Sequence, residues 1–198
     1  PAKRGCAALR ALNPMLAGHA RVFIALGGNF LSATPATEYT AQALSRCRLT
    51  VHISTKLNRA HLVTGTEALI LPALGRTDTD LQEDIPQYVT TENTMGVVQT
   101  SQGPLEPVSR FIKSEVNIVA NLAKATFANR EGPWEHINWD RLMHHYDDIR
   151  DLISRVVPGH DNYIERVNKP GGFYLANPIR DARQFPTSSG KARFTVHP

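Results

Sequence analysis

The sequence predicts an α/β fold: a three-layer sandwich with a mostly parallel sheet, followed by two helices and an extended tail. Two observations lead to this prediction. Between residues 21 and 74, short apolar runs rich in Val, Ile and Leu are separated by a helical segment and a polar connection. After residue 108, apolar residues recur at helical spacing. A strand, helix, strand, connection, strand order implies parallel strands with right-handed crossovers.

The first half of the chain supplies the expected sheet. A helix is expected over 3–17, ending near Asn13 because Pro14 disfavours helical geometry at the residue before it. The run RVFIAL, 21–26, predicts a buried strand that stops at two glycines. A helix from Ser32 to Cys47 follows, with Thr34 as N-cap and Pro35 in the first position. The second and third strands are expected at 49–54 and 68–74.

The second half of the chain has a different character. Residues 87–107 contain two β-type runs separated by Asn93-Thr94-Met95-Gly96, which predicts an irregular hairpin or extended arm. Amphipathic helices are expected at 109–128 and, capped by Asn138, at 139–157. From about Asn168 to Pro198 the chain is rich in Pro, Gly, Ser and Arg, which predicts a loop-like tail.

Composition narrows the function classes. The formal net charge is only +4 and the basic residues are scattered, whereas a nucleic-acid-binding protein typically has a basic stripe. No apolar run approaches the roughly 20 residues needed to cross a bilayer, and no secretory signal precedes the first strand. Two cysteines are too few for a disulfide framework. We therefore expect a cytoplasmic protein without nucleic-acid or membrane partners, and the missing initiator Met suggests a processed or excised piece.

The sharpest local motif is ALGGNF, 25–30. A strand runs into Gly27, Gly28 and Asn29 and then into a helix. Glycines at such a turn let the backbone approach a ligand, and the N–H groups beyond it favour an anionic group such as a phosphate. The third spaced glycine of the dinucleotide fingerprint is missing. A tight turn that binds nothing is the alternative, and the motif alone leaves both open.

A polar cluster follows the second strand. Ser54, Thr55, Lys56, Asn58 and Arg59 come where ligands sit in doubly wound sheets, beyond the carboxyl ends of the strands. They could hydrogen-bond a ribose, a phosphate or a base. The strand ends in Ser54 rather than in an acidic residue, which argues against NAD. A solvated polar loop is the alternative interpretation.

No residue in this chain is predicted to be catalytic or to bind a metal. His144 and His145 are adjacent, so on a helix they point about 100° apart and cannot easily share one ion. No Gly-x-Ser-x-Gly elbow is present, and Cys47 closes an apolar helix face, which predicts a core residue. The sequence TSSGK lacks the earlier glycine of a phosphate-binding P-loop.

Several segments, in this order, resemble one family. These are VFIALGGNFLSATPATEYT, LTVHISTKLNRAHLVTG, ALILPALGRTDTD, TMGVVQTSQGPLEPVSRFIKSEVNIVANLA and, near the end, FPTSSGKARF. Together they resemble the large subunit of molybdopterin-dependent oxidoreductases, in particular the formate dehydrogenase-like alpha subunits of the YdeP type. The resemblance runs from about Arg21 to the end of the chain.

The resemblance implies a function for the two polar segments. In this family a Rossmann-like domain binds molybdopterin guanine dinucleotide, and the molybdenum cofactor performs the two-electron oxidation of formate or a related small substrate. Gly27, Gly28 and Asn29 match the turn at the pyrophosphate. Ser54, Thr55, Lys56 and Asn58 match the clamp around the ribose and guanine. An iron–sulfur cluster, if the parent enzyme has one, would lie outside this chain, which has no cysteine motif for it.

The sequence therefore predicts a Rossmann-like cofactor-binding domain over 1–130. A helical extension and linker over 131–198 would lead toward a C-terminal barrel that this chain does not contain. The partners implied are the remaining domains of the parent chain and a small-molecule substrate such as formate. The alternatives are a stand-alone Rossmann-like domain that binds another nucleotide and a non-catalytic interaction module using the amphipathic helices.

Overall fold

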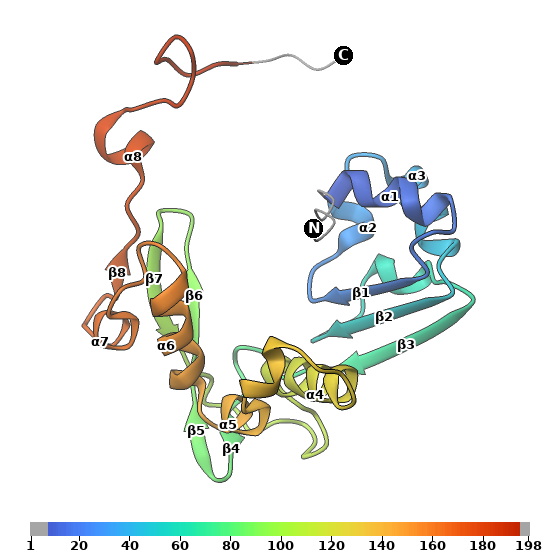
Figure 1. Ribbon diagram of the computed structural model, residues 1–198, viewed down its shortest axis with the longest axis horizontal. Helices are drawn as coiled ribbons and strands as arrows, with labels where there is room; N and C mark the ends of the chain where they lie inside the picture. Colours follow the sequence, from blue (N-terminus) through green and yellow to red (C-terminus); the bar gives the residue numbers. More distant parts are fainter. Residues whose placement is uncertain (1–7, 195–198) are drawn as a thin grey trace. The chain divides into compact units, whose positions relative to one another are not determined.

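The structure is a computed structural model that describes residues 8–194 (Figure 1). The chain forms two compact units. The first contains the chain up to Gly75 together with Glu106–Leu122, and the second contains Arg76–Leu105 and the chain from Ala123 onward. The predicted division into domains at 1–130 and 131–198 stays a prediction.

A three-stranded parallel sheet forms the centre of the first unit. Its strands are β1 (Val22–Leu26), β2 (Leu49–Ser54) and β3 (Glu67–Pro72), in the order β1-β2-β3. Ile24 pairs with Val51, which pairs with Leu69. Helices α1 (Ala8–Leu16), α2 (Phe30–Ala33) and α3 (Thr37–Ser45) lie on one side of this sheet (Figure 1). The α/β fold with a mostly parallel sheet is thus confirmed, and the arrangement is consistent with a Rossmann-like fold.

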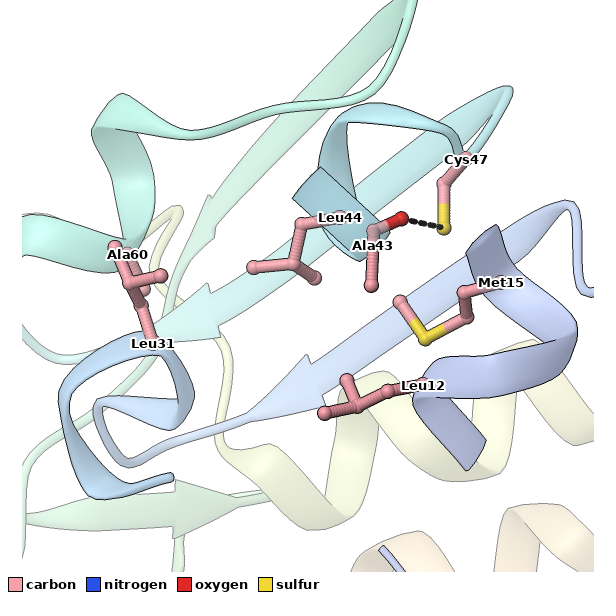
Figure 2. Packing of buried hydrophobic residues seen from close by; sticks show 7 residues of the cluster. All are labelled: Leu12, Met15, Leu31, Ala43, Leu44, Cys47 and Ala60. Carbon is pink, nitrogen blue, oxygen red and sulfur yellow. Dashed lines mark hydrogen bonds between the residues drawn. The ribbon is translucent and has the colours of Figure 1, made fainter. Parts of the chain in front are cut away.

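The core of this unit lies between the helices and the sheet (Figure 2). Its buried members come from α1, α2, α3, the turn after α3 and the 3-10 helix η1 (Arg59–Leu62): Leu12, Met15, Leu31, Ala43, Leu44, Cys47 and Ala60. The interpretation of Cys47 as a core residue is confirmed, because its side chain is fully buried and burial raises the pKa of its thiol. Cys6 lies outside the described residues.

The end of the first helix differs from the prediction. Helix α1 does not end before Pro14 but continues to Leu16, because Met15 packs into the core and tertiary packing outweighs the local cost of proline. The predicted start of that helix, residues 3–7, lies outside the described residues.

The single helix predicted over 32–47 is wrong. The chain instead forms α2 and α3, and Thr34 is the C-cap of the first rather than the N-cap of the second. The Thr34 hydroxyl donates to the Leu31 carbonyl at 3.3 Å and shares a 2.6 Å hydrogen bond with the hydroxyl of buried Thr40. These bonds hold the link between the two helices in an extended conformation.

Strand β1 is not buried on both faces as predicted. Its alternate residues Val22, Ile24 and Leu26 are 56%, 46% and 51% exposed. Phe23 and Ala25, which point the other way, are half-buried. The apolar run therefore marks a strand correctly but does not show that both faces are covered.

The second unit contains short antiparallel strands. Strands β4 (Asp80–Gln82) and β5 (Ile85–Gln87) form one hairpin, and β6 (Val89–Glu92), β7 (Val97–Ser101) and β8 (Phe173–Tyr174) form a second sheet. The hairpin predicted around Asn93–Gly96 is confirmed as the β6–β7 pair.

Helices account for most of the remaining chain. Helix α4 (Glu115–Phe127) lies within the predicted 109–128 segment but begins later. The helix predicted at 139–157 is capped by Asn138 as expected, but a break at His145 divides it into α5 (Trp139–His144) and α6 (Tyr146–Val156). The other helices are η2 (Pro133–His136), α7 (Tyr163–Val167) and α8 (Pro178–Ala182). Strand β8 and helix α8 make the tail less loop-like than predicted, and residues 195–198 lie outside the described part.

The described residues lack membrane-spanning helices and metal-binding clusters. None of their helices is both long and apolar enough to cross a membrane. They also contain no group of three or more His, Cys, Asp or Glu side chains placed to hold a metal ion.

Candidate functional site

The two polar segments singled out in the sequence meet at one edge of the parallel sheet. Because β1, β2 and β3 run in the same direction, their carboxyl ends lie together. The turn after β1 is joined to β2 by a hydrogen bond in which the Gly27 N–H donates to the Ile53 carbonyl at 2.8 Å. The Ala73 N–H donates to the Ser54 carbonyl at 3.1 Å, which joins the end of β3 to the same edge.

The Gly27-Gly28 turn needs glycine because of its backbone conformation. The φ angles of Gly27 and Gly28 are 64° and 71°, in the left-handed region that side chains disfavour. A Cβ on Gly28 would have no neighbouring atom within 4 Å. The space above Gly28 is therefore open, and a group bound there could come close to the backbone.

Unsatisfied backbone donors follow this turn. In the described part of the chain, no protein group accepts a hydrogen bond from the N–H groups of Gly28, Asn29, Phe30 or Leu31. Asn29 precedes α2, and its side chain makes no capping hydrogen bond. Successive free N–H groups attract an anion such as a phosphate. Helix α2 itself has only four residues, so the dipole of a long helix adds little here.

Asn58 connects the two predicted segments directly. Its side-chain Nδ2 donates to the Gly28 carbonyl at 2.8 Å, while its Oδ1 accepts from the Ala60 N–H at 2.9 Å and caps η1. The Asn58 backbone N–H in turn donates to Nδ1 of His61 at 3.0 Å. One side chain thus fixes both the loop after β2 and the position of the glycine turn.

The other predicted clamp residues lie in the same loop, residues 54–58, which we call the clamp loop. The Ser54 hydroxyl donates to the Lys56 carbonyl at 2.7 Å, so it is engaged within the loop itself. The side chains of Thr55 and Lys56 are exposed. The structure therefore brings Gly27, Gly28 and Asn58 into one connected cluster beside Asn29 and places Ser54, Thr55 and Lys56 next to it. A binding role for any of them stays a prediction.

Glu115 also belongs to this edge and was missed by sequence reasoning. Its Oε1 lies 3.5 Å from the position that a Cβ on Gly27 would occupy. The segment before it is joined to the chain just after β3, because the Leu74 N–H donates to the Lys113 carbonyl at 3.0 Å. Nothing local in the sequence marks this residue, since its proximity to Gly27 arises from a contact between distant parts of the chain.

Two histidines lie behind the clamp loop. His52 on β2 is 3% exposed, and its ring centroid lies 4.7 Å from that of His61. Burial, and then the charge of His61, lower the pKa of His52. The Nε2 atoms of both rings are buried, and none of residues 8–194 forms a hydrogen bond with either. The pair therefore favours the uncharged state of His52.

The second unit has a polar cleft of about 720 Å³ between the β4–β5 hairpin and helices α5 and α6. Several of its charged groups are paired with one another. Arg150, only 4% exposed, lies 3.6 Å above the Tyr88 ring and donates to Asp147 Oδ1 at 2.6 Å. Arg141 donates to Asp148 and thereby lowers the pKa of that carboxyl group. These contacts show that Arg141, Asp147, Asp148 and Arg150 have partners within the second unit.

Comparison with known proteins gives relatives along the whole chain. No protein-family model matches it. Over 198 residues the chain is 50% identical to proteins named uncharacterized oxidoreductase in Mycobacterium bovis and Mycobacterium tuberculosis. Over 194 residues, 98% of the chain, it is 40% identical to the Escherichia coli protein YdeP. The chain spans 25% of the length of each of these relatives.

These relatives support some of the sequence predictions and leave others untested. Two of the three are named as oxidoreductases, so this chain has homologues among larger oxidoreductases. The resemblance to the YdeP type is supported by a relative of that name. Their names mention neither molybdopterin nor formate, so the cofactor and the substrate stay predictions.

Proposed function

We propose that this chain is the guanine dinucleotide-binding part of a larger, molybdopterin-dependent oxidoreductase of the formate dehydrogenase type. The relatives named oxidoreductases, of whose length it spans a quarter, support a larger parent protein. The cofactor and the formate-like substrate come from the resemblance of its motifs to that family.

The observation that carries the proposal is the open glycine turn at the carboxyl edge of the sheet. Gly28 combines a left-handed φ with open space above it, and the free N–H groups of Gly28 and Asn29 adjoin that space. Ligands of open α/β sheets bind at this edge. A pyrophosphate fits such a turn, because it accepts several hydrogen bonds and needs close backbone approach.

Each residue of the cluster has a defined task in this proposal. Gly27 and Gly28 let the backbone approach the pyrophosphate, and Asn58 holds the turn through the Gly28 carbonyl. The exposed Lys56 contributes positive charge and the exposed Thr55 a hydroxyl group for the nucleoside half. The Ser54 hydroxyl donates to the Lys56 carbonyl, so its oxygen is left to accept a hydrogen bond. Glu115 adds a hydrogen-bond acceptor beside Gly27 that favours ribose hydroxyl or guanine N–H donors over phosphate.

The redox chemistry belongs to the cofactor, which when bound supplies a molybdenum centre for two-electron transfer. The residues of this chain would bind and orient its nucleotide end. The ligands of the metal, any iron–sulfur cluster and the substrate-binding residues would come from the rest of the parent protein.

The test uses the full-length protein that contains this chain. Molybdenum is measured by elemental analysis, and guanine nucleotide is measured as the GMP released by acid hydrolysis. Gly28→Val should lower both contents severalfold, because a β-branched side chain at positive φ distorts the turn and fills the open space. Gly171→Val is the matched control, since Gly171 also has a positive φ and open space but lies in the second unit.

Two outcomes separate the alternatives. A wild-type protein without guanine nucleotide contradicts the proposal. Thermal stabilisation by NAD but not by GDP would favour the stand-alone nucleotide-binding domain.

A further inference from the structure

Strand β1 is an edge strand with an uncovered apolar face. In the described residues it pairs only with β2, so its other edge has no partner. Val22, Ile24 and Leu26 lie on one face of the strand and are 46% to 56% exposed. On the same face, Leu69 of β3, which is in register with Ile24 through Val51, is 45% exposed.

Such a surface is unusual for a parallel sheet. Parallel sheets are normally covered on both faces, because both faces consist of apolar side chains. Free edges are normally protected by a charged residue, a proline or a bulge. The sequence VFIAL of β1 contains none of these, and its pairing with β2 is regular.

The position of this edge matters for the site. The Gly27-Gly28 turn follows directly after β1, so it borders β2 and the clamp loop on one side only. In doubly wound sheets the ligand crevice lies at the carboxyl ends of two adjacent strands whose following connections run to opposite sides of the sheet. Here β2 and β3 lie on one side of β1, and the neighbour on its other side is missing from the described residues.

We propose that the free edge of β1 pairs with a parallel strand from polypeptide outside these 198 residues, and that an apolar helix accompanying that strand covers Val22, Ile24 and Leu26. The added strand supplies the second wall of the crevice above Gly28. The statement about the crevice rests on the proposed function, whereas the pairing itself does not.

The length of the relatives supports this occupant. Three quarters of each relative's length lies outside the matched region, which is ample for a strand and a helix. A second copy of the chain fits less well. The edge of β1 has five residues and is about 17 Å long, which is short for a stable dimer interface.

The test compares this chain with the full-length protein. Ile24→Cys is introduced into a Cys6→Ser background, with the buried Cys47 retained, and the rate of modification by a maleimide is measured in both proteins. Gln42→Cys, on the exposed surface of α3, is the matched control. We expect the Ile24→Cys thiol to react at least tenfold more slowly in the full-length protein, and the rate for Gln42→Cys to change by less than about twofold.

Hydrogen exchange of the unsubstituted proteins provides a second measurement that does not depend on how the variants fold. Amides of residues 22–26 should exchange more slowly in the full-length protein. Equal modification and equal exchange in the two proteins would overturn the proposal. A second result would also overturn it: protection of β1 in the isolated chain that increases with protein concentration, with a dimer seen in sedimentation. The partner of β1 would then be a second copy of the chain.

These readouts use no nucleotide, so they are independent of the proposed function. A full-length protein that protects β1 but contains no guanine nucleotide would contradict the proposed function and leave the pairing intact. A full-length protein that contains guanine nucleotide but leaves β1 unprotected would support the proposed function and contradict the strand pairing.

Discussion

Replacing Asn58 by serine tests the connection between the two halves of the candidate site. Serine retains an oxygen that accepts from the Ala60 N–H and caps η1, but it is too short to reach the Gly28 carbonyl. Asn58→Ala removes both hydrogen bonds. The lost bridge is worth about 1 kcal/mol, and the lost cap about 1 kcal/mol more.

The assay uses residues that report on each unit separately. Both tryptophans, Trp134 and Trp139, lie in the second unit, so their fluorescence follows that unit. Buried Cys47 lies in the first unit, so in a Cys6→Ser background its reaction with a thiol reagent follows opening of the site-bearing unit.

The expected rates follow from these free energies. Asn58→Ser should speed modification of Cys47 about fivefold and Asn58→Ala about thirtyfold, without moving the tryptophan unfolding transition. The reasoning is refuted if Asn58→Ser reacts at the wild-type rate, because the bridge to Gly28 would then contribute nothing. It is also refuted if the two variants react equally fast, because the cap would then contribute nothing.

Three further predictions concern stability. Leu44→Ala should destabilise the first unit by about 3–5 kcal/mol in urea unfolding, whereas Leu62→Ala, at an 85% exposed side chain, should stay within about 0.5 kcal/mol. Because burial lowers the pKa of His52, the unfolded chain binds a proton more readily than the folded chain below about pH 6.5. Stability followed by circular dichroism should therefore fall as the pH drops from about 7.5 to about 5.5, and it should fall less in His52→Gln but as much as wild type in His19→Gln. Gly172→Ala should lower the tryptophan unfolding midpoint, because its Cβ would overlap the backbone carbonyl of Val98 in β7; an unchanged midpoint would contradict that packing.

The parts of the fold that the sequence predicts correctly depend on local signals. The apolar run before Gly27 and the β-branched residues of 49–54 identify two neighbouring strands, and the two glycines mark the turn between strand and helix. The parallel pairing then follows from the crossover connections between the strands, which are too long for hairpins.

The parts that could not be predicted depend on contacts between distant residues. The break between α2 and α3 is stabilised by the hydrogen bond between Thr34 and Thr40, whose geometry no propensity contains. The continuation of α1 through Pro14 depends on the packing of Met15. The exposure of β1 could not be predicted either, because an apolar run looks the same whether its partner lies inside or outside the chain.

The candidate site shows the same division. Gly27, Gly28 and Asn58 are identifiable from their positions after two strands, but the hydrogen bond that joins them is a tertiary feature. Glu115 gives no local signal, because only the fold brings α4 beside the glycine turn.

The most direct test of the central claim is the nucleotide and metal content of the full-length protein. Our account predicts guanine nucleotide and molybdenum in a fixed ratio, both reduced by Gly28→Val and unchanged by Gly171→Val. A purified, folded wild-type protein that releases no GMP on acid hydrolysis would contradict it.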